Sequence, residues 1–534
     1  MSFHKEISNA LSYITAHGYQ IHPEAFKILK NLDSNIMEII QKVVRFKKNQ
    51  NDTNIILIED IRNFCTINIS NEFDTLTISD SKLQDKNIIK TTINETQEFE
   101  IISTSTPEIT INKQNFSRES FKIIYDSADY IDPEEGIAGY ISLFKSRFHQ
   151  SLKILSTRPE SKRINKISSI KRKIKQEKNN NYLENNLSVN GNTSIIAGLV
   201  MSKRSKKNNI ELAIDDLTGI INTIALNEET IKLVSKLTLD QMVMLEIENK
   251  GINHVIKNVI SPDIPDHIPN KGKSDGYVVL ISDLHIGSKY FKEQEFLKFL
   301  NWLNSSDNEI VSKINFLCIG GDLIDGVGIF PNQEKELYDS TIYQQMSHLT
   351  SLLEQIPKKI QVFVIPGNHD LGRRALPQPA IPKKDAGILY SWKNFTMLGN
   401  PSYIELNGVK ILMYHGQGLD DIIATIPGLS YSNPAEAMKT LLKARHLSPI
   451  YGQRTPIAPE KDDMMVITEI PDIFHSGHVH VMDVQNYRGT LIVNSGAWQD
   501  QTPFQQTMGI IPTSGIAIAV NLSTLRPFQI DFSQ

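Results

Sequence analysis

Residues 277–285 read YVVLISDLH, an apolar run that ends in Asp283 and His285. A run of this length is typical of a buried strand, and carboxylate and imidazole groups are common metal ligands. Because the two residues lie two positions apart at a strand end, both side chains can turn towards one ion as the chain becomes a loop. This stretch predicts a strand of a layered fold that carries metal ligands at its end.

Five more apolar runs follow in the second half of the chain. In chain order they read NFLCIGG, VFVIPG, ILMY, DIFHSG and TLIVNSG. The ligand candidates beside them are Asp322, Asn368, His415, His478 and His480. Singly, such residues are more often helix caps or core histidines. Together, ligand types suited to two divalent cations at successive strand ends predict a two-metal phosphoesterase site, and therefore an enzyme.

The candidates differ in the roles that we expect. Asp322 follows two glycines, and its carboxylate is our candidate to bridge both cations. Asn368 supplies a neutral amide oxygen, and the alternating pair His478 and His480 can place one nitrogen on each ion. Asp325 has two open interpretations, because it either orients a metal ligand or simply ends the turn.

A catalytic pair is expected directly after Asn368. In two-metal sites, ions about 3.5–4 Å apart deprotonate a bridging water that attacks phosphorus in line. The leaving oxygen then needs a proton, and we predict that His369 supplies it while Asp370 orients the imidazole ring. Arg373 and Arg374 either steady a substrate phosphate or form surface ion pairs. These residues predict hydrolysis of a phosphate ester.

The composition excludes several classes of protein. The 534 residues include 56 basic and 60 acidic side chains, and the net charge of −4 argues against a globally basic nucleic-acid coat. Two cysteines, Cys65 and Cys318, exclude a disulfide framework, and Cys318 is expected to be a buried thiol. No apolar stretch approaches a membrane span, and the N-terminus lacks the apolar core of a signal peptide. We expect a soluble cytoplasmic protein with no membrane partner.

The first half of the chain divides by composition. Residues 1–66 repeat apolar residues at three- and four-residue spacing and predict a small helical module. Residues 67–138 predict a linker or weakly ordered segment, polar to about 117, with order returning from about 118. Residues 139–189 predict a helix and a basic linker. Within it, 158–178 holds nine Lys or Arg against two Glu, which suits a solvated helix face or contacts with a phosphate backbone.

Two further domains follow. Residues 190–262 alternate strand-like runs with turns and one helix in the order typical of an OB-fold β-barrel. They contain no Phe, Trp or Tyr on which bases could stack, so protein docking is favoured over single-strand binding. After a Pro-rich linker at 263–276, residues 277–534 alternate apolar strands with helices and predict a layered α/β domain.

The motif set D-x-H, G-D, G-N-H-D, H-G and G-H-x-H resembles the calcineurin-like metallophosphoesterase superfamily. The residues between the motifs point to one family within this superfamily. Segments 326–333, 377–379, 445–452 and 495–499 are similar to the small subunits of archaeal family D DNA polymerases. The similarity is specific over about 139–534 and weak over the first 138 residues.

The resemblance implies a two-sheet α/β sandwich beside an OB-fold and a helical N-terminal module. It also implies a 3′→5′ exonuclease that proofreads DNA 3′ ends for a large polymerizing subunit. Two divalent ions would assist it, usually Mn²⁺, with Fe and Zn as alternatives. One ion would take Asp283, His285, Asp322 and His480, and the other Asp322, Asn368, His415 and His478. His369 remains as the catalytic histidine. Residues 526–534 either bind a sliding clamp or, as we favour, form a last strand or a disordered end.

Two other functions stay open at this stage. The related accessory subunits of eukaryotic replicative polymerases share the architecture but have lost metal ligands, so one alternative is a catalytically silent scaffold. Every ligand position is filled here, which argues against it. The other alternative is a different phosphoesterase, such as a protein phosphatase or a cyclic-nucleotide hydrolase, and the flanking segments argue against that. His446 and Trp498 either shape a substrate groove or pack loops, and we favour packing.

Overall fold

The computed structural model describes residues 121–181, 193–250, 253–305 and 308–533, together with short pieces of the first 56 residues. The chain divides into two units, Met1–Thr110 and Ile111–Gln534. In the first unit, helix α3 (Ile36–Gln50) is described, and strands β1 (Gln20–Ile21) and β2 (Ile55–Ile56) pair in parallel. Most of the remaining predicted helical module, and residues 67–120 of the predicted linker, lie outside the described residues.

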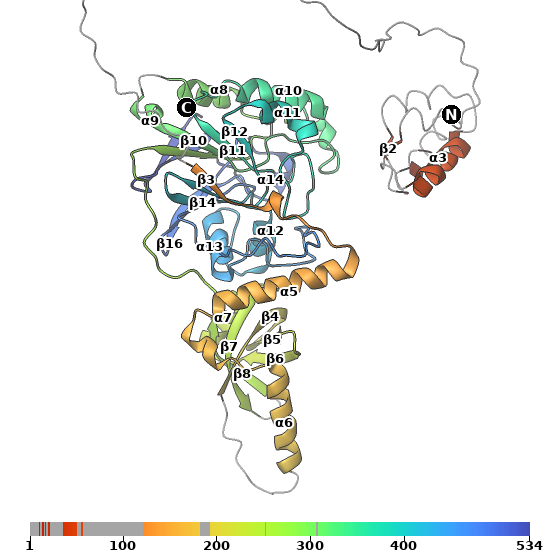
Figure 1. The fold of residues 1–534 in the computed structure, drawn as a ribbon, viewed down its shortest axis with the longest axis vertical. Coiled ribbons are helices and arrows are strands. Elements are labelled where there is room, and N and C mark those ends of the chain that lie inside the picture. Colours follow the sequence, from red (N-terminus) through yellow and green to blue (C-terminus); the bar gives the residue numbers. More distant parts are fainter. Residues whose placement is uncertain are drawn as a thin grey trace, which may run out of the picture. The chain divides into compact units, whose positions relative to one another are not determined.

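The second unit contains two six-stranded mixed sheets (Figure 1). The first has the order β12-β11-β10-β9-β18-β19, in which β9 to β12 are parallel and β18 and β19 are antiparallel. Its strands are β9 (Tyr277–Ile281), β10 (Ile314–Ile319), β11 (Gln361–Val364), β12 (Phe395–Met397), β18 (Ile516–Asn521) and β19 (Pro527–Asp531). The favoured prediction of a last strand near the C-terminus is confirmed by β19.

The second sheet has the order β16-β17-β15-β14-β13-β3. Its strands are β3 (Phe121–Asp126), β13 (Ser402–Leu406), β14 (Val409–Met413), β15 (Ile473–Ser476), β16 (Met482–Tyr487) and β17 (Thr490–Ser495). An apolar cluster fills the space between the sheets, with Leu280 and Phe316 from the first and Ile411 and Val493 from the second. This cluster makes the two sheets a sandwich, as predicted.

Helices cover the outer faces of the sandwich. Those on the first sheet are α8 (Glu293–Leu303), α9 (Glu309–Ser312), α10 (Ile342–Leu353) and α11 (Lys383–Ser391). Those on the second are α12 (Gly418–Thr425) and α13 (Pro434–Ala444). In α8 the buried residues recur at three- and four-residue spacing, from Phe296 and Phe299 to Leu300 and Leu303, which gives one apolar stripe towards the sheet. Short elements complete this part, namely α14 (Pro503–Thr507) and the 3₁₀ turns η2 (Ser127–Asp129) and η4 (Gln333–Lys335).

Residues 193–260 form a closed five-stranded barrel with the order β4-β5-β6-β8-β7. Its elements are β4 (Thr193–Lys206), β5 (Asn209–Asp215), β6 (Ile220–Ala225), α7 (Glu228–Ser235), β7 (Met242–Lys250) and β8 (Asn253–Ile260). The expected barrel, with its single helix before the fourth strand, is therefore present. Its assignment as an OB-fold remains our prediction.

Helices α5 (Gly136–Leu155) and α6 (Ile167–Asn181), joined through the 3₁₀ turn η3 (Pro159–Arg163), precede the barrel. Ile167 and Ile170 of α6 pack into the barrel core. The side chains of Lys171, Arg172 and Lys173 are exposed. This part of the basic stretch is therefore the solvated face of a helix, and any contact with phosphates remains a prediction.

The C-terminal part of segment 67–138 is ordered, in line with the expected return of order from about 118, so the predicted linker does not reach residue 138. Phe121–Asp126 forms β3, which pairs antiparallel with β13 at the edge of the second sheet. The Oδ1 atom of Asp126 accepts hydrogen bonds from the backbone N–H groups of Ala128 and Gly399. The stability of this strand comes from a partner about 280 residues away, which local composition does not reveal.

Within the described ranges, none of the helices combines the length and apolarity that a membrane span requires. Cys318 is a buried free thiol, as expected.

A buried arginine joins α5, the barrel and the sandwich. Arg147 is 1% exposed, and its Nε donates to Oδ2 of Asp463 at 2.6 Å. Its Nη1 donates to the backbone carbonyls of Pro449 and Asp240, the second of which belongs to the barrel. A buried charge is tolerated only when it is paired and hydrogen-bonded, so this residue fixes three segments in one arrangement.

Replacing Arg147 with Ala should therefore lower the free energy of unfolding by about 3–5 kcal/mol, because the buried Asp463 carboxylate would lose its arginine and keep only His446 and the backbone N–H of Met465. Urea denaturation followed by circular dichroism measures this. Lys461→Ala, which removes the exposed pair with Asp132, is the matched control and should change little. A loss for Arg147→Ala no greater than that of the control would contradict the role of Arg147.

Candidate metal centre

The predicted ligands lie at strand ends of both sheets, and their backbone conformation is unusual. Five of the seven predicted ligands have positive φ angles, which non-glycine residues rarely adopt. These are Asp283 (54°), His285 (50°), Asp322 (52°), His478 (72°) and His480 (60°). Each such residue costs about 1–3 kcal/mol, and such strain persists where the surroundings enforce it, typically at functional sites.

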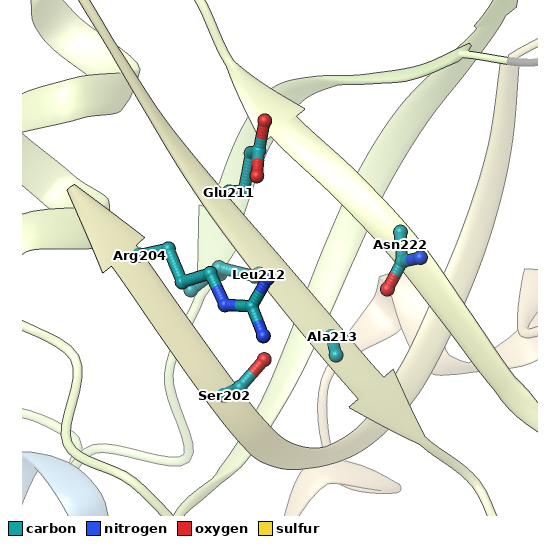
Figure 2. A pocket seen from close by; sticks show the side chains of 6 residues that line it. All are labelled: Ser202, Arg204, Glu211, Leu212, Ala213 and Asn222. Carbon is teal, nitrogen blue, oxygen red and sulfur yellow. The ribbon is translucent and has the colours of Figure 1, made fainter. Parts of the chain in front are cut away.

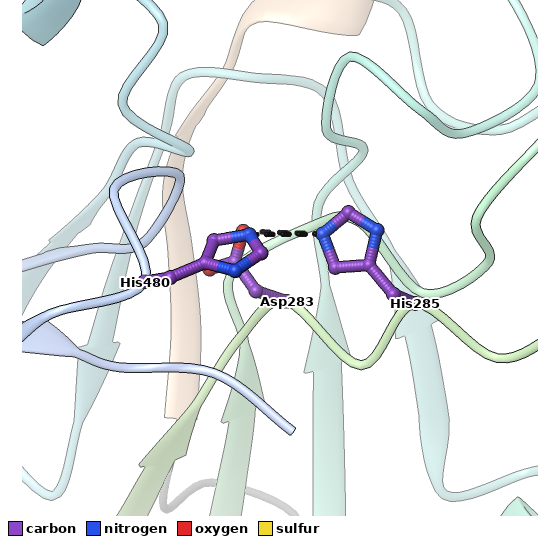
Figure 3. A group of neighbouring side chains, drawn as sticks. All are labelled: Asp283, His285 and His480. Atoms are coloured by element: carbon purple, nitrogen blue, oxygen red, sulfur yellow. Dashed lines mark hydrogen bonds and ion pairs between the residues drawn. The ribbon is translucent and has the colours of Figure 1, made fainter. Parts of the chain in front are cut away.

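One group of candidates consists of Asp283, His285 and His480, whose ligand atoms all lie within 4.8 Å of one another (Figure 3). The Nε2 atoms of His285 and His480 are 3.0 Å apart. Oδ1 of Asp283 is 3.5 Å from Nε2 of His480 and 3.9 Å from Nε2 of His285. All three side chains are almost fully buried, so a polar cluster converges on one point inside the protein.

The second group consists of Asp322, His415 and His478, again with ligand atoms within 4.8 Å. Nε2 of His415 lies 3.3 Å from Oδ2 of Asp322 and 3.0 Å from Oδ1 of Asn368. The same Oδ2 is 3.6 Å from Nε2 of His285 in the first group. Asp322 thus lies between the two groups, which is the position that a bridging carboxylate requires.

Each of the four histidines has one ring nitrogen held by a partner outside the cluster. Nδ1 of His285 contacts Oδ1 of Asp325 at 3.0 Å, and Nδ1 of His415 contacts the Gly320 carbonyl at 2.8 Å. Nδ1 of His480 lies 2.8 Å from Nε2 of Gln505. Nε2 of His478 lies 3.1 Å from Oδ2 of Asp420. The oxygen acceptors beside His285, His415 and His478 fix these rings through one N–H and leave the other nitrogen for a metal. Gln505 instead fixes the ring of His480 by donating its amide N–H to Nδ1.

Two of these partners were missed by the sequence reasoning, and one was left open. Asp325 orients the ring of His285, so the first of its two interpretations is supported. Asp420 stands beside Asp421, whose carboxylate instead accepts the backbone N–H of Arg454. No local signal in the sequence separates the two aspartates, or marks Gln505 as a partner of a histidine far away.

Two glycines of the motifs lie so close to carboxylate groups that no larger residue would fit in their place. A Cβ atom at Gly477 would lie 2.2 Å from Oδ2 of Asp283, and one at Gly367 would lie 2.2 Å from Oδ1 of Asp322. The glycine of G-H-x-H and that of G-N-H-D therefore leave room for carboxylates of other loops. Ser282 adds a hydrogen bond from its Oγ to Oδ2 of Asp283 at 2.5 Å.

His369 lies at the edge of the cluster. Its Nδ1 contacts the backbone carbonyl of Asp325 at 2.8 Å, and its ring centroid is 4.6 Å from that of His285. The expectation that Asp370 orients this ring is wrong. The carboxylate of Asp370 accepts the backbone N–H groups of Leu323 and Gly367 at 2.9 Å, so it holds two ligand-bearing loops together.

The charge balance of the cluster suits a cation. Burial disfavours the charged form of His285 and His415, yet the surrounding carboxylates, Asp322 among them, raise the pKa of each to about 9. Burial and the neighbouring His285 lower the pKa of His480. The cluster therefore stabilises positive charge despite its burial, while His480 stays neutral.

The remaining predicted residues have structural contacts. Arg373 pairs with the buried carboxylate of Glu460, which supports the ion-pair interpretation, whereas Arg374 is exposed. His446 and Trp498 are 2% and 1% exposed. Both pack inside the protein, as favoured.

A separate hollow lies on the barrel (Figure 2), with a volume of about 480 Å³. The residues that line it are Ser202, Arg204, Glu211, Leu212, Ala213 and Asn222. Arg204 and Glu211 face each other across β4 and β5. The lining offers no aromatic ring for a base, in keeping with the expected docking role.

Comparison with known proteins identifies the family. Residues 278–481 match the family model of the DNA polymerase alpha/epsilon B subunits. The DNA polymerase II small subunit of Archaeoglobus fulgidus is 38% identical over 370 residues, which are 68% of this chain and 73% of the relative. That of Methanothermobacter thermautotrophicus is 35% identical over 416 residues, or 76% and 82%. The chain belongs to the archaeal DNA polymerase II small-subunit family.

The match to other members of the family is less complete. The Pyrococcus furiosus small subunit is 38% identical over 74% of this chain, and the aligned region spans 64% of that relative, which is less than two thirds. Among solved structures, a Vps29 mutant from Entamoeba histolytica aligns over 48% of this chain and 99% of its own, at 14% identity and a TM-score of 0.24. Membership of the small-subunit family therefore rests on the sequence relatives.

Asp322→Ala should lose both metal ions, because this side chain contacts both ligand groups. Metal content after Mn²⁺ loading and desalting, measured by mass spectrometry, should fall from two ions per chain to none. Asp500→Ala removes an exposed carboxylate and serves as the control. Retention of two ions in Asp322→Ala would refute the bridge.

Asp420→Asn should weaken only the site that contains His478, because the carboxylate fixes the ring of that histidine. We expect about a 10- to 100-fold loss of Mn²⁺ affinity at one of two sites in calorimetric titrations. Glu436→Gln, in an exposed pair on α13, should leave both affinities unchanged. Equal weakening at both sites would show that Asp420 does not act through His478 alone.

Proposed function

We propose that this chain is a two-metal 3′→5′ DNA exonuclease and the proofreading small subunit of a family D DNA polymerase. The observation that carries the proposal is the complete ligand set, in which every candidate histidine also has a partner that fixes its ring. Membership of the small-subunit family supports DNA at a replication complex as the substrate and the cytoplasm as the compartment. Fold alone would not imply activity.

The donor atoms divide between two ions. Asp283, His285, Asp322 and His480 would hold one ion, and Asp322, Asn368, His415 and His478 the other. When bound, the pair of ions lowers the pKa of a water molecule and neutralises phosphate charge. Mixed nitrogen and oxygen ligands suit Mn²⁺, our first choice, and also Fe and Zn.

His369 is the proposed general acid. Its Nδ1 is engaged by the Asp325 carbonyl, which leaves Nε2 as the nitrogen that can meet a substrate. Burial lowers the pKa of this histidine, while the charge of Asp322 opposes that shift. A bound phosphodiester adds further negative charge and so favours the protonated ring. The proton would pass to the O3′ atom that leaves phosphorus.

The proposed partners are the large polymerizing subunit and DNA 3′ ends. The barrel, which lacks aromatic residues, is our candidate for docking the large subunit. A sliding-clamp contact through residues 526–534 has little support, because Pro527–Asp531 is paired with β18 as the edge strand of the first sheet.

Two rival functions make different predictions. A silent scaffold would bind the large subunit without degrading DNA in the presence of Mn²⁺. Another phosphoesterase would hydrolyse phosphopeptides or cyclic nucleotides in preference to DNA. Release of nucleotides from a 3′-labelled single strand by the purified chain with Mn²⁺ would support our proposal over both.

His369→Ala should reduce exonuclease activity at least about 100-fold, since the leaving oxygen loses its proton donor. Metal content and co-purification with the large subunit should stay at wild-type levels. Tyr130→Ala, an exposed aromatic position, is a matched surface control. Full activity of His369→Ala would rule out its role as general acid.

A further inference from the structure

A short apolar loop beside His369 is held in one conformation. Residues 326–333 read GVGIFPNQ and follow directly on Asp325. The Nε2 atom of Gln333 donates to the backbone carbonyl and to Oδ2 of Asp325, both at 2.8 Å, and its Oε1 accepts the backbone N–H of Ile329. Gln345 accepts the N–H of Gly326 and donates to its carbonyl, at 2.9 and 3.0 Å. Buried amides therefore fix this loop from both sides.

The loop packs closely against the segment that carries the proposed general acid. A Cβ atom at Gly326 would lie 2.6 Å from the backbone oxygen of His369. The ring centroid of Phe330 is 6.4 Å from that of His369, with 59° between the planes. An aromatic side chain thus stands next to the residue that faces the leaving group.

Phe330 is not part of the core. It is half-buried, Val327 in the same loop is 43% exposed, and neither packs into the apolar clusters of the sandwich. Two side chains are far too few for a protein interface, which needs about 800 Å² per partner. A single planar side chain on a fixed loop instead suits one planar ligand group.

We propose that Phe330 stacks against the base of the penultimate nucleotide of the substrate strand. The inference rests on the proposed function. In hydrolysis the water oxygen bonds to phosphorus, the bond from phosphorus to O3′ breaks, and O3′ takes the proton from His369. That oxygen belongs to the penultimate nucleotide, so its base lies on the side of His369 and Phe330.

Stacking of this kind selects the form of the DNA. A base inside a duplex has both faces covered by its neighbours, whereas a single-stranded or frayed end offers a free face. The rigid loop therefore favours unpaired 3′ ends. Aromatic stacking contributes about 1–3 kcal/mol per base, which corresponds to about 5- to 150-fold in affinity.

Phe330→Ala and Phe330→Trp test the inference on two single strands, one intact and one with an abasic penultimate nucleotide. The wild type should prefer the intact strand at least about fivefold in kcat/KM. Phe330→Ala should lose this preference, and Phe330→Trp should keep it. Tyr343→Ala, which removes an aromatic ring that is 83% exposed on α10, is the control and should behave as the wild type.

A binding measurement gives a readout without turnover. A strand with 2-aminopurine at the penultimate position is titrated with metal-free protein in EDTA. Its fluorescence should be quenched by the wild type and by Phe330→Trp, but not by Phe330→Ala. Metal content and thermal unfolding of each variant show whether it is folded.

Three results for Phe330→Ala would overturn the inference. The variant could keep the preference for the intact strand, or it could lose kcat/KM equally on both strands. It could also fail to co-purify with the large polymerizing subunit, which would make the loop a docking surface. Failure of the proposed function looks different. The wild type would then hydrolyse bis(p-nitrophenyl) phosphate but not DNA, and the fluorescence titration would still decide whether Phe330 meets a base.

Discussion

The carboxylate of Asp322 is the contact on which the rest of the site depends. Its Oδ1 accepts the backbone N–H of His369, and its Oδ2 lies between Nε2 of His415 and Nε2 of His285. One side chain at the end of β10 therefore fixes loops that follow β9, β11 and β14. Because these contacts are buried, where electrostatic interactions are strong, a shift of this strand end would disturb both ligand groups together.

The two sheets bring these loops together at a cost in backbone strain. Left-handed conformations at five ligand positions would be unfavourable in an isolated chain, and the surrounding hydrogen bonds enforce them. Gly367 and Gly477 contribute by the absence of a side chain, since any Cβ would collide with a ligand carboxylate. The rigid sandwich thus holds the candidate ligands in place, as the proposed two-metal chemistry would require.

The residues that the fold gathers into the candidate metal centre could be named from the sequence, whereas most of the residues that hold them in place could not. Strand-end motifs are local, so residues such as Asp283 and His415 can be recognised from the runs beside them. Asp420 and Gln505 act across the fold, and their neighbours in the chain carry no trace of it. Asp370 was assigned to the wrong partner for the same reason, since its hydrogen bonds reach the backbone of another loop. The strand Phe121–Asp126 was missed because its stability comes from β13.

Apolar periodicity and motif spacing lie along the chain, and they predict the alternation of strands and helices and the kinds and order of the candidate ligands. The way in which these residues meet is a property of the tertiary structure. It showed that Asp322 lies between two groups, that Asp325 and Asp420 hold imidazole rings, and that Phe330 stands beside His369. Those facts depend on the packing of two sheets against each other, and such packing joins residues whose separation in sequence says nothing about their distance in space.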